Sequence, residues 1–412
     1  MKMRRPTALL VAAICCGACL LRAPLSVVGA LADVIQSDLA LSAGSVGLLT
    51  TIPLLAFAAS SAFVGRLGAL LGKRRLLAAG CGLIAVGLAV RSVGGAGCLF
   101  AGTVIMGVGI ASGNVLIPAV IKERFPLRIG ALTGLYTTLM TLSAAGAAAG
   151  AQALREAGVG WRPALAILLP AALVALVLWL AAQREGADAR AASAEPAPAA
   201  GLAAGAARPA GEPAGGVSLR QLLRTPLTWW IAGLVGIQSA VYYSALAWIP
   251  AILAAKGLDP ATAILGFTLF TVAGIPLHAV VPPLAAAMRR QRLFGLASGL
   301  LCCLSIVLLL VARSAWACLV AVSLIAVSTA VVFTLAVTLF GLRTSDGDTA
   351  GELSGVAQAI GYLVAAVGPV MLGALFDATG NWEVSLVALA ALAALIALCG
   401  WKSGDGVIAP RR

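Results

Sequence analysis

The sequence predicts an all-α membrane protein with twelve transmembrane helices arranged as two six-helix bundles. Of its 412 residues, 61% are hydrophobic and only 10% are charged, and the mean hydropathy is +1.04. Soluble domains carry about 25% charged residues, and a spanning helix needs about 20 apolar residues. The composition therefore excludes a soluble domain, a disordered chain and a secreted disulfide scaffold, and the length leaves room for a dozen spans.

Uninterrupted apolar windows place the spans along the chain. The first stretch runs past Arg22 to Gly29, so we expect a retained helix and not a cleaved signal peptide. The first six predicted spans are 8–30, 44–65, 76–93, 97–121, 130–153 and 163–182. The second six are 227–251, 261–287, 293–312, 315–340, 353–375 and 384–401.

Residues 183–224 interrupt this succession of apolar spans and are rich in Ala, Pro and Gly. Such a composition cannot bury a core, so we expect a flexible cytoplasmic linker that ends in a short helix capped by Ser218. The chain then divides into an N-terminal bundle (1–182), the linker (183–224) and a C-terminal bundle (225–412).

The two predicted bundles resemble each other at an offset near 220 residues. Segment 130–134, Gly-Ala-Leu-Thr-Gly, matches segment 351–355, Gly-Glu-Leu-Ser-Gly, and Lys73 falls on Arg290 at an offset of 217. Matches in several segments at a nearly constant offset indicate an internal repeat. Two parallel repeats place a substrate site between the bundles, near the middle of the bilayer.

The net charge of +13 is distributed as a membrane topology signal, so we expect a lipid bilayer and no nucleic acid as partner. All but six of the 28 Lys and Arg residues fall on the face that carries both termini and the linker. We expect that face to be cytoplasmic, in the inner membrane of a bacterium, and the protein to be a monomer. The six exceptions are Arg22, Arg91, Arg155, Arg162, Lys256 and Arg313.

Several motifs resemble those of the major facilitator superfamily. The loop after the second span, residues 65–75, is similar to the Gly-rich basic loop of that superfamily, with Ala69 in place of its usual acidic residue. The resemblance implies a gating role for Gly65, Gly72, Lys73 and Arg74.

Four further segments resemble the cyanate permease and 2-nitroimidazole transporter family. They are 21–29 (Leu-Arg-Ala-Pro-Leu-Ser-Val-Val-Gly), 113–118 (Gly-Asn-Val-Leu-Ile-Pro), 133–137 (Thr-Gly-Leu-Tyr-Thr) and 238–250 (with Gln-Ser, Tyr and Ala-Trp-Ile-Pro). The resemblance implies a secondary transporter that moves a small, compact, polar solute by alternating access. A cyanate-like anion, a nitroimidazole-like compound and another small weak acid remain open. A broader drug efflux permease is less favoured, since Thr103 stands where drug antiporters place an Arg.

Arg22 is the most informative single residue. It lies about 15 positions into the first span, roughly 22 Å from the inner end, and a charge at that depth costs about 2.5–3.5 kcal/mol on insertion scales. No carboxylate lies at a matching depth in any predicted span. We therefore expect Arg22 to face the pathway and bind an anionic or electron-rich solute, the alternative being a salt bridge or a carbonyl contact that ties helices together.

Polar side chains also follow one face of several otherwise apolar spans. Gln238 and Tyr242 lie four residues apart, and therefore on one face of a helix, and similar stripes occur in the fifth and eleventh spans. The alternative for each residue is hydrogen bonding between helices without a ligand. The predicted substrate-binding residues are Arg22, Asn114, Tyr136, Thr137, Gln238, Tyr242, Tyr243, Gln358 and Tyr362.

His278 is the one His of the chain, and its alternatives are a packing role and a coupling role for a co-transported proton. No catalytic triad, metal cluster or phosphate loop is recognisable, so we expect no enzyme activity, no cofactor and no metal. A sensor that binds without turnover and a channel are the rival classes. The absence of charged rings along the spans disfavours the channel.

Overall fold

The computed structural model describes residues 5–41, 43–192 and 217–409. The N-terminal half comprises α1 (Arg5–Cys19), α2 (Ala23–Ala30), α3 (Ala32–Asp38), α4 (Ala43–Leu71), α5 (Lys73–Val93), α6 (Ala96–Arg124), α7 (Ile129–Glu156), α8 (Trp161–Leu165) and α9 (Leu169–Ala192). The C-terminal half comprises α10 (Leu219–Arg224), α11 (Pro226–Ala255), α12 (Pro260–Val272), α13 (Ile275–Ala287), α14 (Arg292–Val311), α15 (Ala315–Leu342), α16 (Gly347–Thr379) and α17 (Trp382–Ser403). The short 3-10 turns η1 (Pro126–Arg128) and η2 (Ala166–Leu168) precede α7 and α9.

Eleven segments of the described chain are helical, long and apolar enough to cross a membrane. The one remaining predicted span, the fifth (130–153), corresponds to α7, a 28-residue helix that carries Thr, Ser and Tyr along its length. No β-strand occurs in the described residues, where an isolated bridge joins Thr344 to Ile408. The predicted all-α, twelve-helix architecture is therefore confirmed.

The first predicted span is not continuous, because it is divided into α1 and α2. Pro24 lies in the first turn of α2 and has no N–H to donate, and its ring clashes with the carbonyl four residues earlier, at Leu20. The eighth predicted span is broken in the same way between α12 and α13, where Pro276 lies in the first turn of α13. Arg22 stands in the first break, directly before α2.

Several helices of the C-terminal half begin with a side-chain cap, which satisfies a backbone N–H that the first turn leaves unpaired. Asp259, Ser314, Asp346 and Asn381 accept from backbone N–H groups at the starts of α12, α15, α16 and α17. Ser218 caps α10 by accepting from Gln221 N, as predicted. These caps fix where the spans begin.

The predicted linker is partly helical. Helix α9 continues to Ala192, beyond the boundary expected at residue 182, while residues 193–216 lie outside the described residues, as do the basic residues Lys2, Arg4, Arg208, Arg411 and Arg412.

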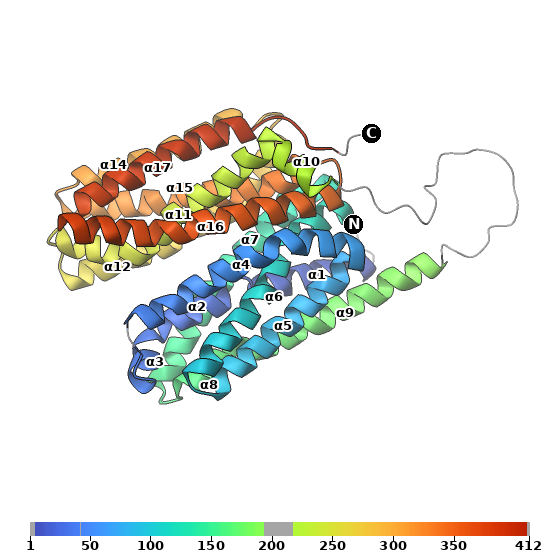
Figure 1. Cartoon of the computed structure of the whole chain (residues 1–412), viewed down its shortest axis with the longest axis horizontal. Coiled ribbons are helices and arrows are strands. Elements are labelled where there is room, and N and C mark those ends of the chain that lie inside the picture. Colours follow the sequence, from blue (N-terminus) through green and yellow to red (C-terminus); the bar gives the residue numbers. More distant parts are fainter. Residues whose placement is uncertain (1–4, 42, 193–216, 410–412) are drawn as a thin grey trace, which may run out of the picture.

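The helices of the two halves lie side by side, with α4, α6 and α7 facing α13, α15 and α16 (Figure 1). The contacts are closest toward the end that carries α10 and both termini, which we call the basic end. There an added Cβ at Gly65 of α4 would lie 2.6 Å from Gly351 O of α16, and one at Gly130 of α7 would lie 2.6 Å from Pro282 O of α13. Glycine thus lets the backbones of the two halves approach closely.

Candidate functional site

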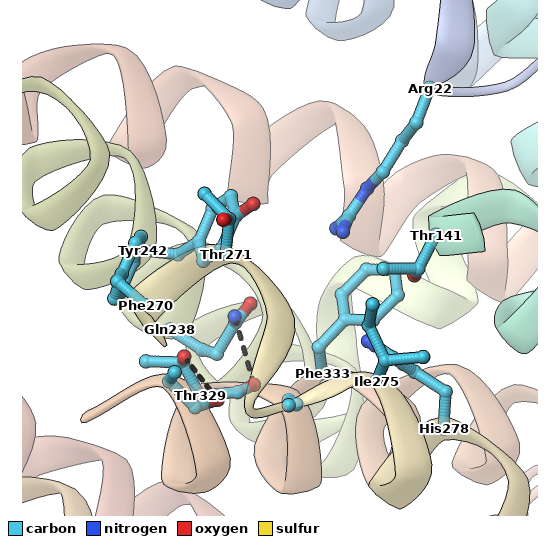
Figure 2. Close-up of a pocket in the computed structure, with 13 residues that line it drawn as sticks. Arg22, Thr141, Gln238, Tyr242, Phe270, Thr271, Ile275, His278, Thr329 and Phe333 are labelled. Atoms are coloured by element: carbon cyan, nitrogen blue, oxygen red, sulfur yellow. Dashed lines mark hydrogen bonds between the residues drawn. The ribbon is translucent and has the colours of Figure 1, made fainter. Parts of the chain in front are cut away.

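Arg22 extends from the break between α1 and α2 into the space between the halves (Figure 2). Its guanidinium carbon lies 4.6 Å from the centroid of the Phe333 ring on α15 and 5.4 Å from that of Tyr242 on α11. Contacts of this length are favourable cation–π interactions. In the described part of the chain, the guanidinium has neither an ion-pair nor a hydrogen-bond partner, so its five N–H donors remain available.

A cavity surrounds this guanidinium, and most of its wall comes from the C-terminal half. It contains about 340 Å³ of space, including space open to solvent. Its lining residues are Arg22 and Thr141 from the N-terminal half and Gln238, Tyr242, Phe270, Thr271, Gly274, Ile275, His278, Ala326, Thr329, Ala330 and Phe333 from the C-terminal half.

The uncharged polar groups of the cavity wall are partly occupied within the protein. The Gln238 amide donates to Thr329 O at 3.1 Å, and its oxygen accepts from Ser239. The Thr141 hydroxyl donates to Thr137 O at 3.0 Å. Because these groups already have partners, Arg22 is the strongest free donor that faces the cavity.

A second cavity lies beside the first and shares Phe333 with it. Its wall is formed by Asn114, Tyr136, Met140, Val235, Phe333, Val337, Phe340, Gln358 and Tyr362, again from both halves. The Gln358 amide crosses between the halves and donates to Asn114 O at 3.1 Å. Seven of the predicted binding residues therefore line two adjoining cavities between the halves.

Thr137 and Tyr243 line neither cavity. The Thr137 hydroxyl lies 2.8 Å from Thr133 O in its own helix and 3.1 Å from His278 O in the other half. It therefore donates to backbone carbonyls and is not free for a solute. Tyr243 packs edge-on against Tyr242 at 5.4 Å. Both residues support neighbours that line the first cavity and do not face it themselves.

Sequence reasoning missed the apolar walls of the cavities. Phe333, Phe270 and Phe340 lie in spans that are predominantly apolar. A residue of this type can face lipid or the pathway with equal ease, so nothing in the local pattern distinguishes it. The Arg22 cation contacts the faces of two aromatic rings, a setting that was not predicted from the sequence.

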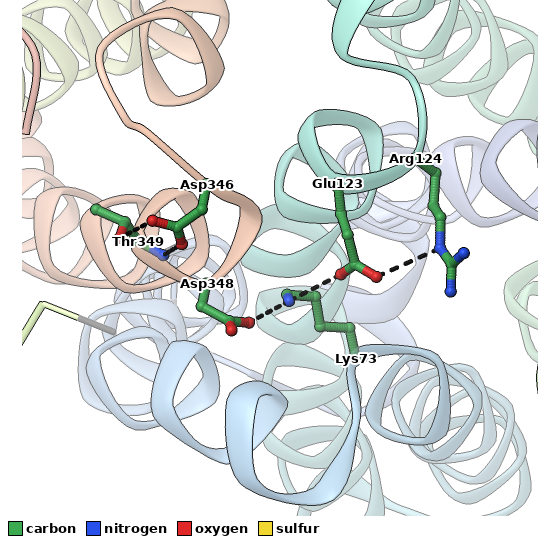
Figure 3. A network of polar contacts seen from close by, with 6 residues as sticks. All are labelled: Lys73, Glu123, Arg124, Asp346, Asp348 and Thr349. Carbon is green, nitrogen blue, oxygen red and sulfur yellow. Dashed lines mark hydrogen bonds and ion pairs between the residues drawn. The ribbon is translucent and has the colours of Figure 1, made fainter. Parts of the chain in front are cut away.

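Lys73, at the start of α5, joins the two halves at the basic end (Figure 3). Its ammonium forms ion pairs with Glu123 of α6, at 2.9 Å, and with Asp348 in the first turn of α16. The Lys73 side chain is 10% exposed, so the pairs are screened only in part. Next to them, Asp346 caps α16; burial opposes its ionisation, but hydrogen bonds from Ser345 and Thr349 outweigh it and lower the pKa of Asp346.

Comparison with known proteins identifies the family. Residues 14–369 match the Major Facilitator Superfamily. The chain belongs to the major facilitator superfamily. It is 32% identical to the uncharacterized transporter YycB of Bacillus subtilis over 385 residues, which are 93% of this chain and 90% of that protein. It is 34% identical to the 2-nitroimidazole transporter of Escherichia coli over 377 residues, 91% of this chain and 90% of that protein. The resemblance inferred from the sequence motifs is thereby confirmed.

Solved structures of the superfamily share the fold. The proton:xylose symporter XylE has a TM-score of 0.76 at 13% identity, with 97% of this chain and 96% of that chain covered. FucP in its outward conformation has a TM-score of 0.71 at 14% identity, with 96% and 99% covered. The relatives are membrane transporters and not enzymes, so this chain is a multi-pass membrane protein of the same kind.

The basic loop of this superfamily member makes its cross-half contact without an acid at position 69. Gly72 has a φ of 93°, a conformation that favours glycine, and it turns the chain from α4 into α5 so that Lys73 meets Asp348. Arg74 instead donates to Ala182 O at 2.6 Å, within its own half. Of the predicted gating residues, Gly65 and Lys73 contact the C-terminal half.

Proposed function

We propose that the protein is a secondary transporter that carries a small polar or anionic solute through the cavities between its halves by alternating access. The observation that carries this proposal is the Arg22 guanidinium, which has no ion-pair or hydrogen-bond partner among the described residues. An anion or a nitro group that leaves water loses its hydration, and a planar guanidinium replaces it with two parallel donors. The preferred classes are a cyanate-like anion and a nitroimidazole-like compound, the latter supported by the name of the Escherichia coli relative.

The division of labour that we propose follows from position. Arg22, Gln238 and Tyr242 in the first cavity and Asn114, Tyr136, Gln358 and Tyr362 in the second would contact the solute, with Thr137 and Tyr243 supporting them. At the basic end, Gly65, Gly72, Lys73 and Arg74 would form the gate that closes the cavities on that side. The bundles 1–182 and 225–412 would move against each other, linked by 183–224.

Ligand binding and turnover are tested separately. Binding to the folded state raises the melting temperature of purified protein, so a thermal-shift screen with cyanate, 2-nitroimidazole and small carboxylates should find a stabilising solute. Counterflow of that solute in proteoliposomes then tests transport. Binding without counterflow would indicate a sensor, and stabilisation by many large, unrelated drugs would indicate a broader efflux permease.

We further propose that the protein lies in the inner membrane of a bacterium as a monomer, with the basic end in the cytoplasm. Leu127, between α6 and α7 at the basic end, is 98% exposed, and Val159 lies in the loop between α7 and α8 at the opposite end. An impermeant thiol reagent added to intact cells should label Val159→Cys and spare Leu127→Cys. The nine native cysteines are all buried or half-buried. Labelling of Leu127→Cys from outside would show that the basic end faces the outside and that the proposed orientation is wrong.

The Lys73 ion pairs should stabilise the closed basic end. These ion pairs are more buried than surface pairs and less buried than core pairs. We therefore expect Lys73→Met or Asp348→Asn to shift the equilibrium between the closed and the open basic end by about 1–3 kcal/mol toward the open state. Spin labels at Leu127 in the N-terminal half and Arg289 in the C-terminal half would report a longer distance. Arg75→Gln is the matched control, because it removes the positive charge of an exposed residue close to Lys73.

A double-mutant cycle isolates the pair itself. If the pair spans the halves as described, the Lys73→Met and Asp348→Asn shifts will be clearly less than additive. Full additivity, or an equal shift in Arg75→Gln, would mean that Lys73 acts only through general charge.

A further inference from the structure

His278 is a buried titratable group in the wall of the Arg22 cavity. It lies on α13 and is 4% exposed. Its backbone carbonyl accepts from the Thr137 hydroxyl of the other half at 3.1 Å, which holds this part of α13 against α7. Its ring nitrogen Nδ1 is buried and has no hydrogen-bond partner in the described part of the chain. A buried polar atom without a hydrogen-bond partner is costly. An unpaired Nδ1 beside a cavity therefore indicates a binding partner that is present in only part of the transport cycle.

Arg22 and His278 act on the same small space (Figure 2). Both line the first cavity and both pack against Phe333: the Arg22 guanidinium carbon is 4.6 Å from the centroid of that ring, and the His278 ring meets it edge-on at 6.1 Å. Phe333 therefore contacts both a permanent cation and a group that can become one.

The other elements around His278 bring no further charge to this cavity within the described residues. Helix α7 contributes Thr141, α11 contributes Gln238 and the neutral phenol Tyr242, α12 contributes Phe270 and Thr271, and α15 contributes Thr329 and Phe333. In the adjoining cavity, α7 adds a second neutral phenol, Tyr136, and α16 adds a third, Tyr362. Arg22 is thus the permanent charge that His278 faces.

This arrangement links two binding events. With the cavity empty, a proton on His278 would place a second positive charge beside Arg22 in a site with little water, which is unfavourable. An anion on Arg22 cancels that charge and supplies an acceptor for the imidazolium. By linkage, the factor by which the bound anion increases the affinity for the proton equals the factor by which the bound proton increases the affinity for the anion.

We propose that the cavity binds one anion on Arg22 together with one proton on His278, so that the solute travels as an electroneutral pair. This inference rests on the proposed transport function and names its coupling ion. The proton comes from the water on the side where the cavity is open and returns to water on the other side when the anion leaves. No residue other than His278 has to change its charge.

The probe for this inference is thiocyanate, a monoanion of a strong acid that does not itself titrate between pH 5 and 8. Its dissociation constant should fall by about tenfold or more from pH 7.5 to pH 5.5, since coupled uptake of one proton changes it by at most about tenfold per pH unit. Titration calorimetry in two buffers of different ionisation enthalpy should count about one proton taken up per anion.

His278→Gln keeps a polar side chain but cannot take the proton. We expect it to bind thiocyanate more weakly than the native protein at pH 5.5, with a dissociation constant that no longer varies with pH and with no proton uptake. A merely structural His278 would instead give a lower melting temperature and an unchanged pH slope in this variant. A flat profile in the native protein would overturn the inference too.

The failure of this inference is distinguishable from the failure of the transport function. If 2-nitroimidazole binds and shows counterflow while thiocyanate binds at no pH, the proposed transport function is supported and the proposed binding of an anion together with a proton is wrong. If neither compound, nor any small solute in the thermal-shift screen, binds at all, the proposed function falls with it.

Discussion

Arg22→Ala is expected to abolish transport without unfolding the protein. The guanidinium has only aromatic faces for partners in the described structure, so its removal breaks no salt bridge between helices. A charge-assisted hydrogen bond is worth about 1.5–3 kcal/mol, which corresponds to a loss of affinity of roughly 10- to 150-fold. Transport of the stabilising solute in proteoliposomes and the melting temperature of the purified variant should be measured together.

Three further variants make this test specific. Arg22→Lys keeps the charge but gives a point donor in place of a planar fork, so it should rescue only in part. Gln238→Ala and Tyr242→Phe remove neutral hydrogen-bonding groups, each worth about 1 kcal/mol, and should have smaller effects. If Arg22→Ala kept normal affinity and rate but lowered the melting temperature, Arg22 would be a structural tie and the anion site would have to be abandoned.

Arg22 could be chosen from the sequence because a charge deep in an apolar span is rare and costly. What could not be predicted was its setting. The break between α1 and α2 depends on Pro24, but proline is tolerated inside many membrane helices, as Pro53 is inside α4. The sequence therefore predicted a continuous span from 8 to 30 where the structure has two helices.

The number and order of the spans were predictable because each depends on a local run of about 20 apolar residues. Contacts between the halves depend on residues far apart in the chain, and no local pattern encodes them. Lys73 and Asp348 are an example, since their pairing requires α5 and α16 to meet. Likewise, the contact between Phe333 and Arg22 requires the two halves to meet.

Gly65→Val is expected to have the second large effect, because it prevents α4 and α16 from closing together. A Cβ at this position would lie 2.6 Å from Gly351 O and 3.0 Å from the Glu352 Cα, both of which are backbone atoms that cannot rotate away. Overpacking of this kind costs typically 1–3 kcal/mol, enough to shift a closed-to-open equilibrium by about 5- to 150-fold.

Gly82→Val is the matched control for this substitution. Gly82 lies within α5, and a Cβ there would meet nothing within 4 Å, so the same change of residue in the same kind of helix should be harmless. The Leu127–Arg289 spin-label distance should lengthen in Gly65→Val alone, and transport should fall more than tenfold in that variant alone. Since alternating access needs the basic end to close once in every cycle, normal transport by Gly65→Val would show that the α4–α16 contact is not part of the gate.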